Sequence, residues 1–367
     1  MAPESAQRMA LRAVSATNPP VSAFDKEPGT GGASSHDAVL ALLSSSAEGR
    51  PVEVIETHMS WVYLLPDEVL KLKKPVRHSF LDFTTLADRE HACRAELRLN
   101  ARLAPRVYRG LLALAWRDGT YALLPEADLG GQIQVRDWLV CMQRLPRERM
   151  LHVAMAAGQV QPGEVDAVVR VLADFFRAAV RIQLAPGMHL ARLREDLALN
   201  REVLLHPRWA VVGARDAISA LQTGFIRHQA TIEQRAAQGH IVDGHGDLRP
   251  EHVCLLDPPV IIDCIEFNPT LREVDPFDEL AFLAMECRLA GADWIGQRLI
   301  DGCARALDDR PPECVMRLYA AHRALIRARL SLAHLLDPQP RAPERWLPQA
   351  QRYVDQALIA LAALPLK

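Results

Sequence analysis

The segment that most constrains this chain is residues 245–252, which read HGDLRPEH, together with the two short apolar runs that follow it. Residues 253–256 and 260–263 are rich in apolar and β-branched side chains and flank the turn sequence DPP at residues 257–259. This pattern predicts a β-hairpin directly after a polar loop. Asp247 lies before the hairpin, and Asp263 ends it sixteen residues later. Both are candidate functional carboxylates.

Residues 37–143 have mostly strand-like patterns around one helix. The helix is expected over residues 84–103 and stops before Pro105. The expected strands are residues 52–57, 61–65, 69–73, 111–115, 121–124 and 138–145. Residues 1–36, rich in Ala, Ser, Pro and Gly, are expected to be disordered.

Residues 144–367 are expected to be largely helical. Apolar residues recur at helical spacing from Val165 to Ala179. A later helix has Asp275 as its N-cap, Pro276 at its first position and Gly291 beyond its end. Two or three further helices are expected up to about residue 363. The order predicts an α+β fold with two lobes, a small antiparallel-sheet lobe and a larger helical lobe that holds the hairpin.

Composition excludes several classes of protein. The net charge of −2 gives no basic footprint for nucleic acid. The seven cysteines are scattered, odd in number and free of C-x-x-C, which is typical of reduced thiols. No apolar run approaches the 18 to 20 residues of a membrane helix, and the N-terminus has no apolar signal segment. We therefore expect a cytoplasmic protein that binds neither nucleic acid nor membrane.

Residues 245–252 also follow the order of the protein-kinase catalytic loop, H-R-D-x-x-x-x-N. Together with the element order, they make the chain resemble the aminoglycoside phosphotransferase family, of protein-kinase-like fold, over about residues 45–335. It is most similar to an uncharacterised bacterial branch in the runs ETHMSW at 56–61, KLKKPV at 71–76 and IEFN at 265–268. Some members of that branch carry a further P-loop domain, whereas this sequence contains no G-x-x-x-x-G-K-[ST].

The resemblance implies transfer of a phosphoryl group from ATP to a hydroxyl of a small molecule. Asp247 would take the hydroxyl proton, and Asp263 would hold Mg²⁺. Arg249 would reach the transferred phosphate, where related loops carry lysine. Taken alone, Asp247 could simply cap a turn, Asp263 could face water at a strand end, and Arg249 could be solvent-exposed.

His252 stands where the family pattern has a metal-binding asparagine. Neutral imidazole suits Zn²⁺ or Mn²⁺ better than Mg²⁺. The substitution is compatible with one metal instead of two, with a preference for another metal, with loss of turnover, or with a histidine that only hydrogen-bonds the loop. His245 is expected to hold the loop backbone.

Lys71 and Lys73 alternate along one strand, so their side chains share a face. The resemblance implies that one of them reaches the α- and β-phosphates, paired with Glu96, or with Glu90 in reserve. We prefer Lys71, because residues 69–72 best match the family's strand. Lysines on an exposed strand edge would look the same.

Further positions follow from the resemblance alone. Ser60 and its backbone would cradle phosphate in the loop at 57–61, which lacks a glycine-rich pattern, and adenine would meet the backbone near Val140 to Met142. Asp275 and Asp278 resemble the helix-start aspartates that brace the catalytic loop, although capping explains them equally well. Glu266 and Asn268 would face the acceptor site and could bind the substrate or a second metal.

Two alternatives remain open. Because of His252 and the missing glycine-rich loop, the chain could be a pseudokinase that binds nucleotide without turnover. His245, Asp247, His252 and Asp263 could instead form a metallohydrolase site, which would leave the lysine strand unexplained. The acceptor itself has no recognisable motif.

Overall fold

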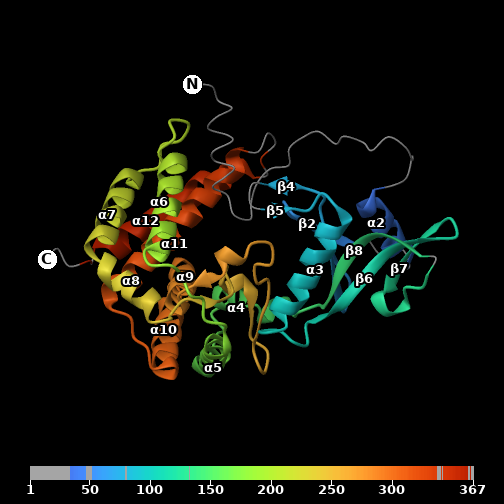
Figure 1. Cartoon of the computed structure of the whole chain (residues 1–367), viewed down its shortest axis with the longest axis horizontal. Coiled ribbons are helices and arrows are strands. Elements are labelled where there is room, and N and C mark those ends of the chain that lie inside the picture. Colours follow the sequence, from blue (N-terminus) through green and yellow to red (C-terminus); the bar gives the residue numbers. More distant parts are fainter. Residues whose placement is uncertain are drawn as a thin grey trace. The chain divides into compact units, whose positions relative to one another are not determined.

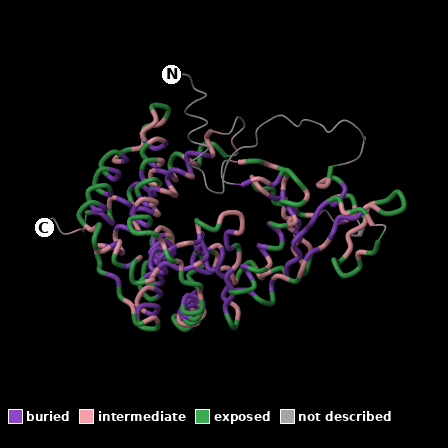
Figure 2. The backbone as a smooth tube through the Cα atoms, in the orientation of Figure 1, coloured by how far each residue is buried: buried purple, intermediate pink, exposed green. Residues whose placement is uncertain are grey.

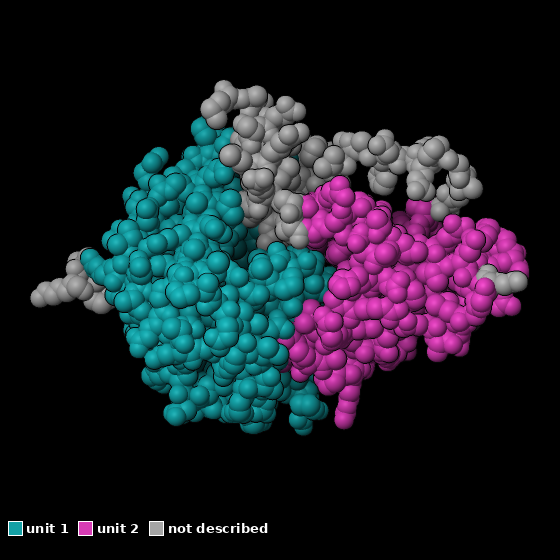
Figure 3. Space-filling view, in the orientation of Figure 1, with its two compact units in different colours: residues 1–18, 146–367 teal, residues 19–145 magenta. Residues whose placement is uncertain are grey.

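The computed structural model describes residues 34–46, 52–78, 81–131, 133–336, 340, 342–362 and 364. Most of the segment expected to be disordered, residues 1–33, lies outside the described residues. The chain forms two compact units, one within residues 19–145 and the other beginning at Pro146, and they are coloured separately in Figure 3.

The smaller unit is built on a six-stranded antiparallel sheet of order β1-β2-β3-β8-β6-β7 (Figure 1). Its strands are β1 (Glu53–Glu56), β2 (Ser60–Leu64), β3 (Glu68–Lys73), β8 (Gln134–Gln143), β6 (Tyr108–Arg117) and β7 (Thr120–Pro125). The unit also contains a hairpin of two short strands, β4 (Arg77–His78) and β5 (Leu81–Asp82), and a 3₁₀ turn, η1 (Glu126–Asp128). All six strands of the sheet were predicted, within a few residues at each end.

Two helices accompany the sheet. Helix α3 (Leu86–Asn100) packs against β8, and the side chain of its N-cap, Thr85, accepts the backbone N–H of Asp88. Helix α2 (Ser35–Ser46) was not predicted, and its first two residues fall in the segment expected to be disordered. Its buried residues, including Val39 and Leu43, pack with Tyr63 and Leu72 of the sheet. The stabilising contacts of α2 are tertiary, and its twelve residues carry little local signal of their own.

The larger unit is mainly helical, as predicted. Its helices are α4 (Leu151–Ala156), α5 (Pro162–Ala178), α6 (Met188–Leu204), α7 (Ala214–Arg227), α8 (Gln229–Ala237), α9 (Pro276–Leu289), α10 (Asp293–Leu307), α11 (Glu313–Ala333) and α12 (Pro343–Ala362). Short 3₁₀ turns are η2 (Arg147–Arg149), η3 (Pro250–His252), η4 (Pro269–Leu271) and η5 (His334–Leu336). No helix in the described part of the chain is long and apolar enough to cross a membrane.

Four short strands interrupt these helices. The predicted hairpin is present as β10 (Val253–Cys254) and β11 (Val260–Ile261), shorter than expected. A second pair, β9 (Val242–Asp243) and β12 (Glu273–Val274), joins segments about thirty residues apart and was not predicted. The loop at residues 244–252, called here the HGD loop, therefore begins at one strand pair and ends at the other.

Helix α9 positions the HGD loop. It is buried along nearly its whole length, as the mostly purple tube in Figure 2 shows at the place labelled α9 in Figure 1, and it packs against α10 and α11. As predicted, Asp275 caps α9, with its side chain accepting the backbone N–H of Phe277. Because so much apolar surface fixes α9, its first turn is a rigid support for the loop beside it.

Candidate active site

The HGD loop is held by a buried carboxylate. Glu279, in the first turn of α9, accepts the backbone N–H of His245 at 3.0 and 3.1 Å and also that of Gly246. Gly246 has φ of 91°, and a Cβ there would lie 3.1 Å from the carbonyl oxygen of Leu271, so this turn requires glycine. Burial raises the pKa of Glu279 to about 7, although the hydrogen bonds from these N–H groups act to lower it. Sequence reasoning missed Glu279, whose only signal is a second acid beside Asp278 at a helix start.

His245 holds the loop backbone, as predicted. Its ring is buried, and its Nε2 lies 2.9 Å from the carbonyl oxygen of Ile262, to which it donates. Its Nδ1 then accepts the backbone N–H of Asp247 at 3.3 Å. Burial lowers the pKa of His245 to about 4, with a contribution from His252. The ring is therefore neutral at physiological pH and links the loop to the residue before Asp263.

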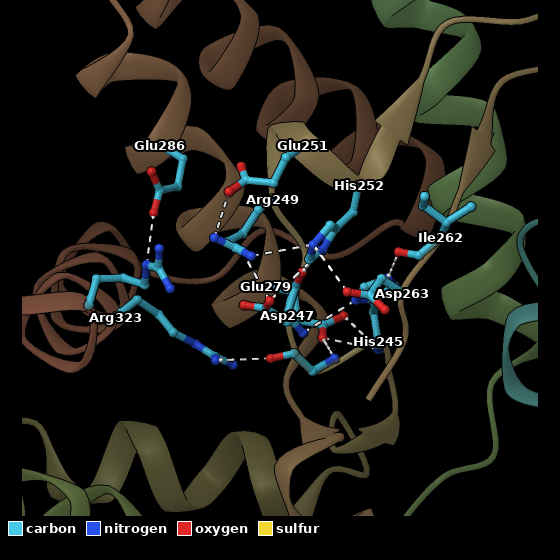
Figure 4. Close-up of polar contacts among 12 residues, drawn as sticks. His245, Asp247, Arg249, Glu251, His252, Ile262, Asp263, Glu279, Glu286 and Arg323 are labelled. Carbon is cyan, nitrogen blue, oxygen red and sulfur yellow. Dashed lines mark hydrogen bonds and ion pairs between the residues drawn. The ribbon is translucent and has the colours of Figure 1, made fainter. Parts of the chain in front are cut away.

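Asp247 lies next to a guanidinium. The Nε of Arg249 donates to Oδ2 of Asp247 at 3.0 Å, and its Nη1 donates to Glu251 at 2.6 Å (Figure 4). Burial raises the pKa of Asp247, but the nearby positive charge, that of Arg249 first, outweighs it and lowers the pKa to about 2. Its side chain is 28% exposed. It is thus an ionised carboxylate that a ligand can reach.

The structure brings His252 and Asp263 together. Nδ1 of His252 donates to the carbonyl oxygen of Asp247 at 2.8 Å, and its Nε2 lies 3.5 Å from Oδ2 of Asp263. Nη2 of Arg249 also donates to Nε2 at 3.3 Å. Asp263 itself has φ of 64° and a half-exposed side chain. Such a left-handed residue is uncommon outside glycine and is found preferentially at functional sites.

These two side chains can serve as metal ligands. A carboxylate oxygen and an imidazole nitrogen, 3.5 Å apart, fit a divalent cation that completes its coordination from a ligand. Mg²⁺ typically has one or two carboxylates plus substrate phosphates. Across the described ranges, no group of three or more His, Cys, Asp or Glu side chains could hold a metal by itself. The His245 ring is already used by the backbone, so the four-residue metallohydrolase site is not assembled.

Two salt bridges hold the start of α9, and one of them also reaches the loop. Arg323 of α11 forms a two-pronged pair with Asp278, with an Nη2–Oδ2 distance of 2.6 Å, and its Nη1 lies 3.4 Å from the carbonyl oxygen of Gly246. Arg235 of α8 pairs in the same way with Asp275, at 2.5 and 3.1 Å. Asp275 therefore caps α9, as one of its two interpretations predicted, and ties α9 to α8. Its bracing of the catalytic loop remains a prediction. Neither arginine was identified from sequence.

In the smaller unit, both candidate lysines contact Glu96 of α3. Lys71 Nζ lies 2.9 Å from Oε1, and Lys73 Nζ lies 2.7 Å from Oε2. The reserve partner, Glu90, instead binds Arg94 on the surface of α3. The Lys71 side chain is 16% exposed, whereas that of Lys73 is 1% exposed. Only Lys71 thus keeps appreciable access to solvent.

Three other expected contacts remain predictions. Ser60 is buried at the start of β2, where its backbone N–H bonds to Oγ1 of Thr57 at 2.9 Å. Val140 and Met142 lie inside the sheet, where β8 pairs with β3 on one side and β6 on the other. This ladder disfavours adenine contact at these two positions, because the backbone of an interior strand is already paired.

One expected acceptor residue has a local role in the structure. Asn268 accepts the backbone N–H and the hydroxyl of Thr270 at 3.0 and 2.8 Å, which caps η4. The Glu266 side chain is partly exposed two residues earlier.

These elements define a protein-kinase-like α+β fold, as predicted. The smaller unit pairs an antiparallel sheet with α3, and the larger, helical unit carries the HGD loop and its hairpin. A solved structure confirms it. A choline/ethanolamine kinase family protein from Mesorhizobium loti has a TM-score of 0.52 over 90% of this chain and 95% of that chain, at 15% identity. An ADP-bound aminoglycoside phosphotransferase, APH(2'')-Ib, has a TM-score of 0.46 over 88% and 99%, at 13% identity.

Sequence relatives are uncharacterised proteins, as the expected bacterial branch implied. Proteins of Mycobacterium tuberculosis and Mycobacterium bovis are 32% identical to this chain over 324 residues, which is 85% of the chain. The chain spans 61% of the length of these relatives. No family model matches the sequence.

Proposed function

We propose that the chain is an ATP-dependent phosphotransferase that moves the γ-phosphate of ATP to a hydroxyl of a small molecule. The observation that supports this most is the grouping of Asp247, His252 and Asp263 at one end of a loop and hairpin braced by α9. An ionised carboxylate beside two candidate metal ligands is what phosphoryl transfer requires. The kinase-like fold agrees with it.

In this proposal, the acceptor oxygen forms a bond to the γ-phosphorus as the bond from that phosphorus to the leaving oxygen of ADP breaks. The hydroxyl proton passes to Asp247. A carboxylate with a pKa of about 2 is a weak base, so its main contribution is to orient the hydroxyl in a loose transition state. Arg249, held at 3.0 Å from Asp247, supplies positive charge for the transferred group.

Asp263 and His252 would hold the divalent cation, Mg²⁺ or Mn²⁺. When bound, such an ion neutralises charge on the nucleotide phosphates. In the smaller unit, Lys71 would bind phosphate while Glu96 orients it, with Lys73 as the buried partner of the same carboxylate. Ser60 would add a contact from the β1–β2 turn.

The test is calorimetric titration of ATP, with and without Mg²⁺ or Mn²⁺, into wild type, Asp263→Asn and Asp247→Asn, with ADP formation measured in parallel. We expect Asp263→Asn to lose metal-dependent ATP binding. Asp247→Asn should still bind ATP but lose hydrolysis or transfer by at least about a hundredfold. Asp301→Asn, on α10, is a matched carboxylate control and should match wild type. No ATP binding with either metal would refute the proposal.

The second candidate is a pseudokinase that binds nucleotide without turnover. It is favoured by His252 at the asparagine position and by the contact of Arg249 with Asp247, which occupies one oxygen of the candidate base. ATP binding without any turnover in wild type would support it. Turnover that disappears in Asp247→Asn would exclude it.

A further inference from the structure

A cavity of about 770 Å³ lies within the larger unit, beside the HGD loop. This volume is in the range of small-molecule sites. Its walls come from the loop itself, the C-terminal turns of α9, α11, η5 and the first half of α12. Arg249 lines the cavity and also donates to Asp247 at 3.0 Å, so the cavity adjoins the candidate base. If the proposed function holds, this is where the acceptor would bind.

Four arginines line this cavity, and only two have carboxylate partners. Arg249 pairs with Asp247 and Glu251, and Arg327 lies 3.3 Å from Glu286. Arg345 and Arg352 line the α12 wall and form no ion pair within the described ranges.

The hydrogen bonds of these two arginines are to neutral groups. Arg345 donates to the side-chain oxygen of Gln349 at 3.2 Å, and Arg352 donates to the carbonyl oxygen of Leu289 at 2.8 Å. Among the lining carboxylates, Glu344 has no ion pair in the described part of the chain. The four lining arginines therefore outnumber the three lining carboxylates by one, and the unpaired guanidinium groups lie on α12.

The aromatic residues of the cavity are already in contact with cations. The guanidinium of Arg345 lies 5.1 Å from the ring centre of Trp346, which also stacks on His334 at 3.7 Å. The guanidinium of Arg327 lies 5.5 Å from the ring centre of Tyr353. A quaternary ammonium or amine ligand relies on free aromatic faces and unpaired carboxylates. Here arginines lie over both aromatic rings, and two of the three lining carboxylates, Glu251 and Glu286, are paired with arginines. Only Glu344 offers an unpaired carboxylate within the described residues, which disfavours a cationic acceptor.

We infer that the acceptor is an anion, a hydroxylated small molecule that bears a carboxylate or phosphate group. Arg345 and Arg352 bind its anionic group, because guanidinium recognises carboxylate and phosphate alike through charge-assisted hydrogen bonds. Its hydroxyl lies toward Arg249 and Asp247, where the oxygen attacks the γ-phosphorus and the proton passes to Asp247. This inference rests on the proposed function and specifies its substrate class.

The test is calorimetric titration with four three- to five-carbon hydroxyl compounds in the presence of Mg²⁺ and a non-hydrolysable ATP analogue. Glycerol 3-phosphate and glycerate are the phosphate and carboxylate probes, glycerol is the neutral probe and choline the cationic one. We expect at least one anion to bind more tightly than glycerol and choline, and its identity distinguishes phosphate from carboxylate. The double variant Arg345→Gln and Arg352→Gln should bind that anion about tenfold or more weakly than wild type does.

Two further variants control this result. Arg310→Gln removes an exposed arginine of the α10–α11 connection and should leave anion affinity unchanged. Arg345→Lys combined with Arg352→Lys keeps the charge and should restore part of the affinity. The inference is overturned if neither anion binds, if choline or glycerol binds more tightly than both anions, or if the glutamine variant binds anions as wild type does. Binding of the ATP analogue in the same samples shows whether the proposed function survives such a result.

Discussion

The imidazole Nδ1 of His252 donates to the carbonyl oxygen of Asp247 at 2.8 Å, and this one hydrogen bond fixes which tautomer the ring adopts. Nε2 is thereby left as the acceptor, 3.3 Å from Nη2 of Arg249 and 3.5 Å from the Asp263 carboxylate on the hairpin, so a metal at Nε2 would replace the Arg249 hydrogen bond. An asparagine at the same position would offer an amide oxygen instead. The identity of residue 252 should therefore decide which metal the site prefers.

For His252→Asn we predict a change in metal selectivity. An amide oxygen suits Mg²⁺ and a neutral imidazole suits Mn²⁺, so the ratio of Mn²⁺ to Mg²⁺ affinity of the ATP complex should fall by about tenfold. The measurement is calorimetric titration of each metal into the ATP-loaded protein. An unchanged ratio would show that His252 only supports the loop.

For Glu279→Ala we predict a large loss of stability. The substitution leaves the buried N–H groups of His245 and Gly246 without an acceptor and opens a cavity, which should lower the free energy of unfolding by roughly 2–5 kcal/mol. Urea denaturation measures this. The control is Glu313→Ala, because Glu313 forms an exposed i,i+4 pair with Arg317 that should contribute under about 1 kcal/mol. Equal losses in the two variants would contradict the role given to Glu279.

Replacing the two lysines singly should separate their roles. Lys73→Met removes one cation from a fully buried pair and should lower the free energy of unfolding by about 3–5 kcal/mol. Lys71→Met should cost less stability but weaken ATP binding by about tenfold, because Lys71 has the greater solvent access. Urea denaturation and ATP titration on both variants decide this. The opposite pattern would assign phosphate binding to Lys73.

His245 should make stability fall on acidification. Its pKa is lowered from 6.5 to about 4 in the folded chain, so below pH 6.5 the unfolded chain binds the proton first. The free energy of unfolding should therefore decrease between pH 6.5 and 4 by up to roughly 3 kcal/mol from this group. In His245→Asn this contribution is absent. The measurement is urea denaturation of both proteins in EDTA at a series of pH values. The free energies of unfolding of the two proteins should converge as the pH falls, and a constant difference between them would disprove the assignment.

Local patterns were sufficient to predict the strands, the hairpin and the start of α9. The alternation of Lys71 and Lys73 marks β3, and Asp275 followed by proline marks a helix N-terminus. The β9–β12 pair was missed because two-residue strands have no periodicity. Local patterns likewise predict only part of the candidate site. Asp247 lies in a motif, but Glu279 and Arg323 hold the preceding residue, Gly246, through tertiary contacts 33 or more residues apart, which no local pattern records.

The order of strands in the smaller unit has a consequence for biosynthesis. β8 is the last of the six strands to be made, yet it lies in the interior of the sheet, between β3 and β6. While the ribosome is still translating residues 134–143, β3 and β6 each have an open edge that could pair with another chain. The sheet closes only when this last strand inserts, a long-range pairing that is intrinsically slow. A nascent chain stalled before residue 134 would therefore be the form most prone to aggregation.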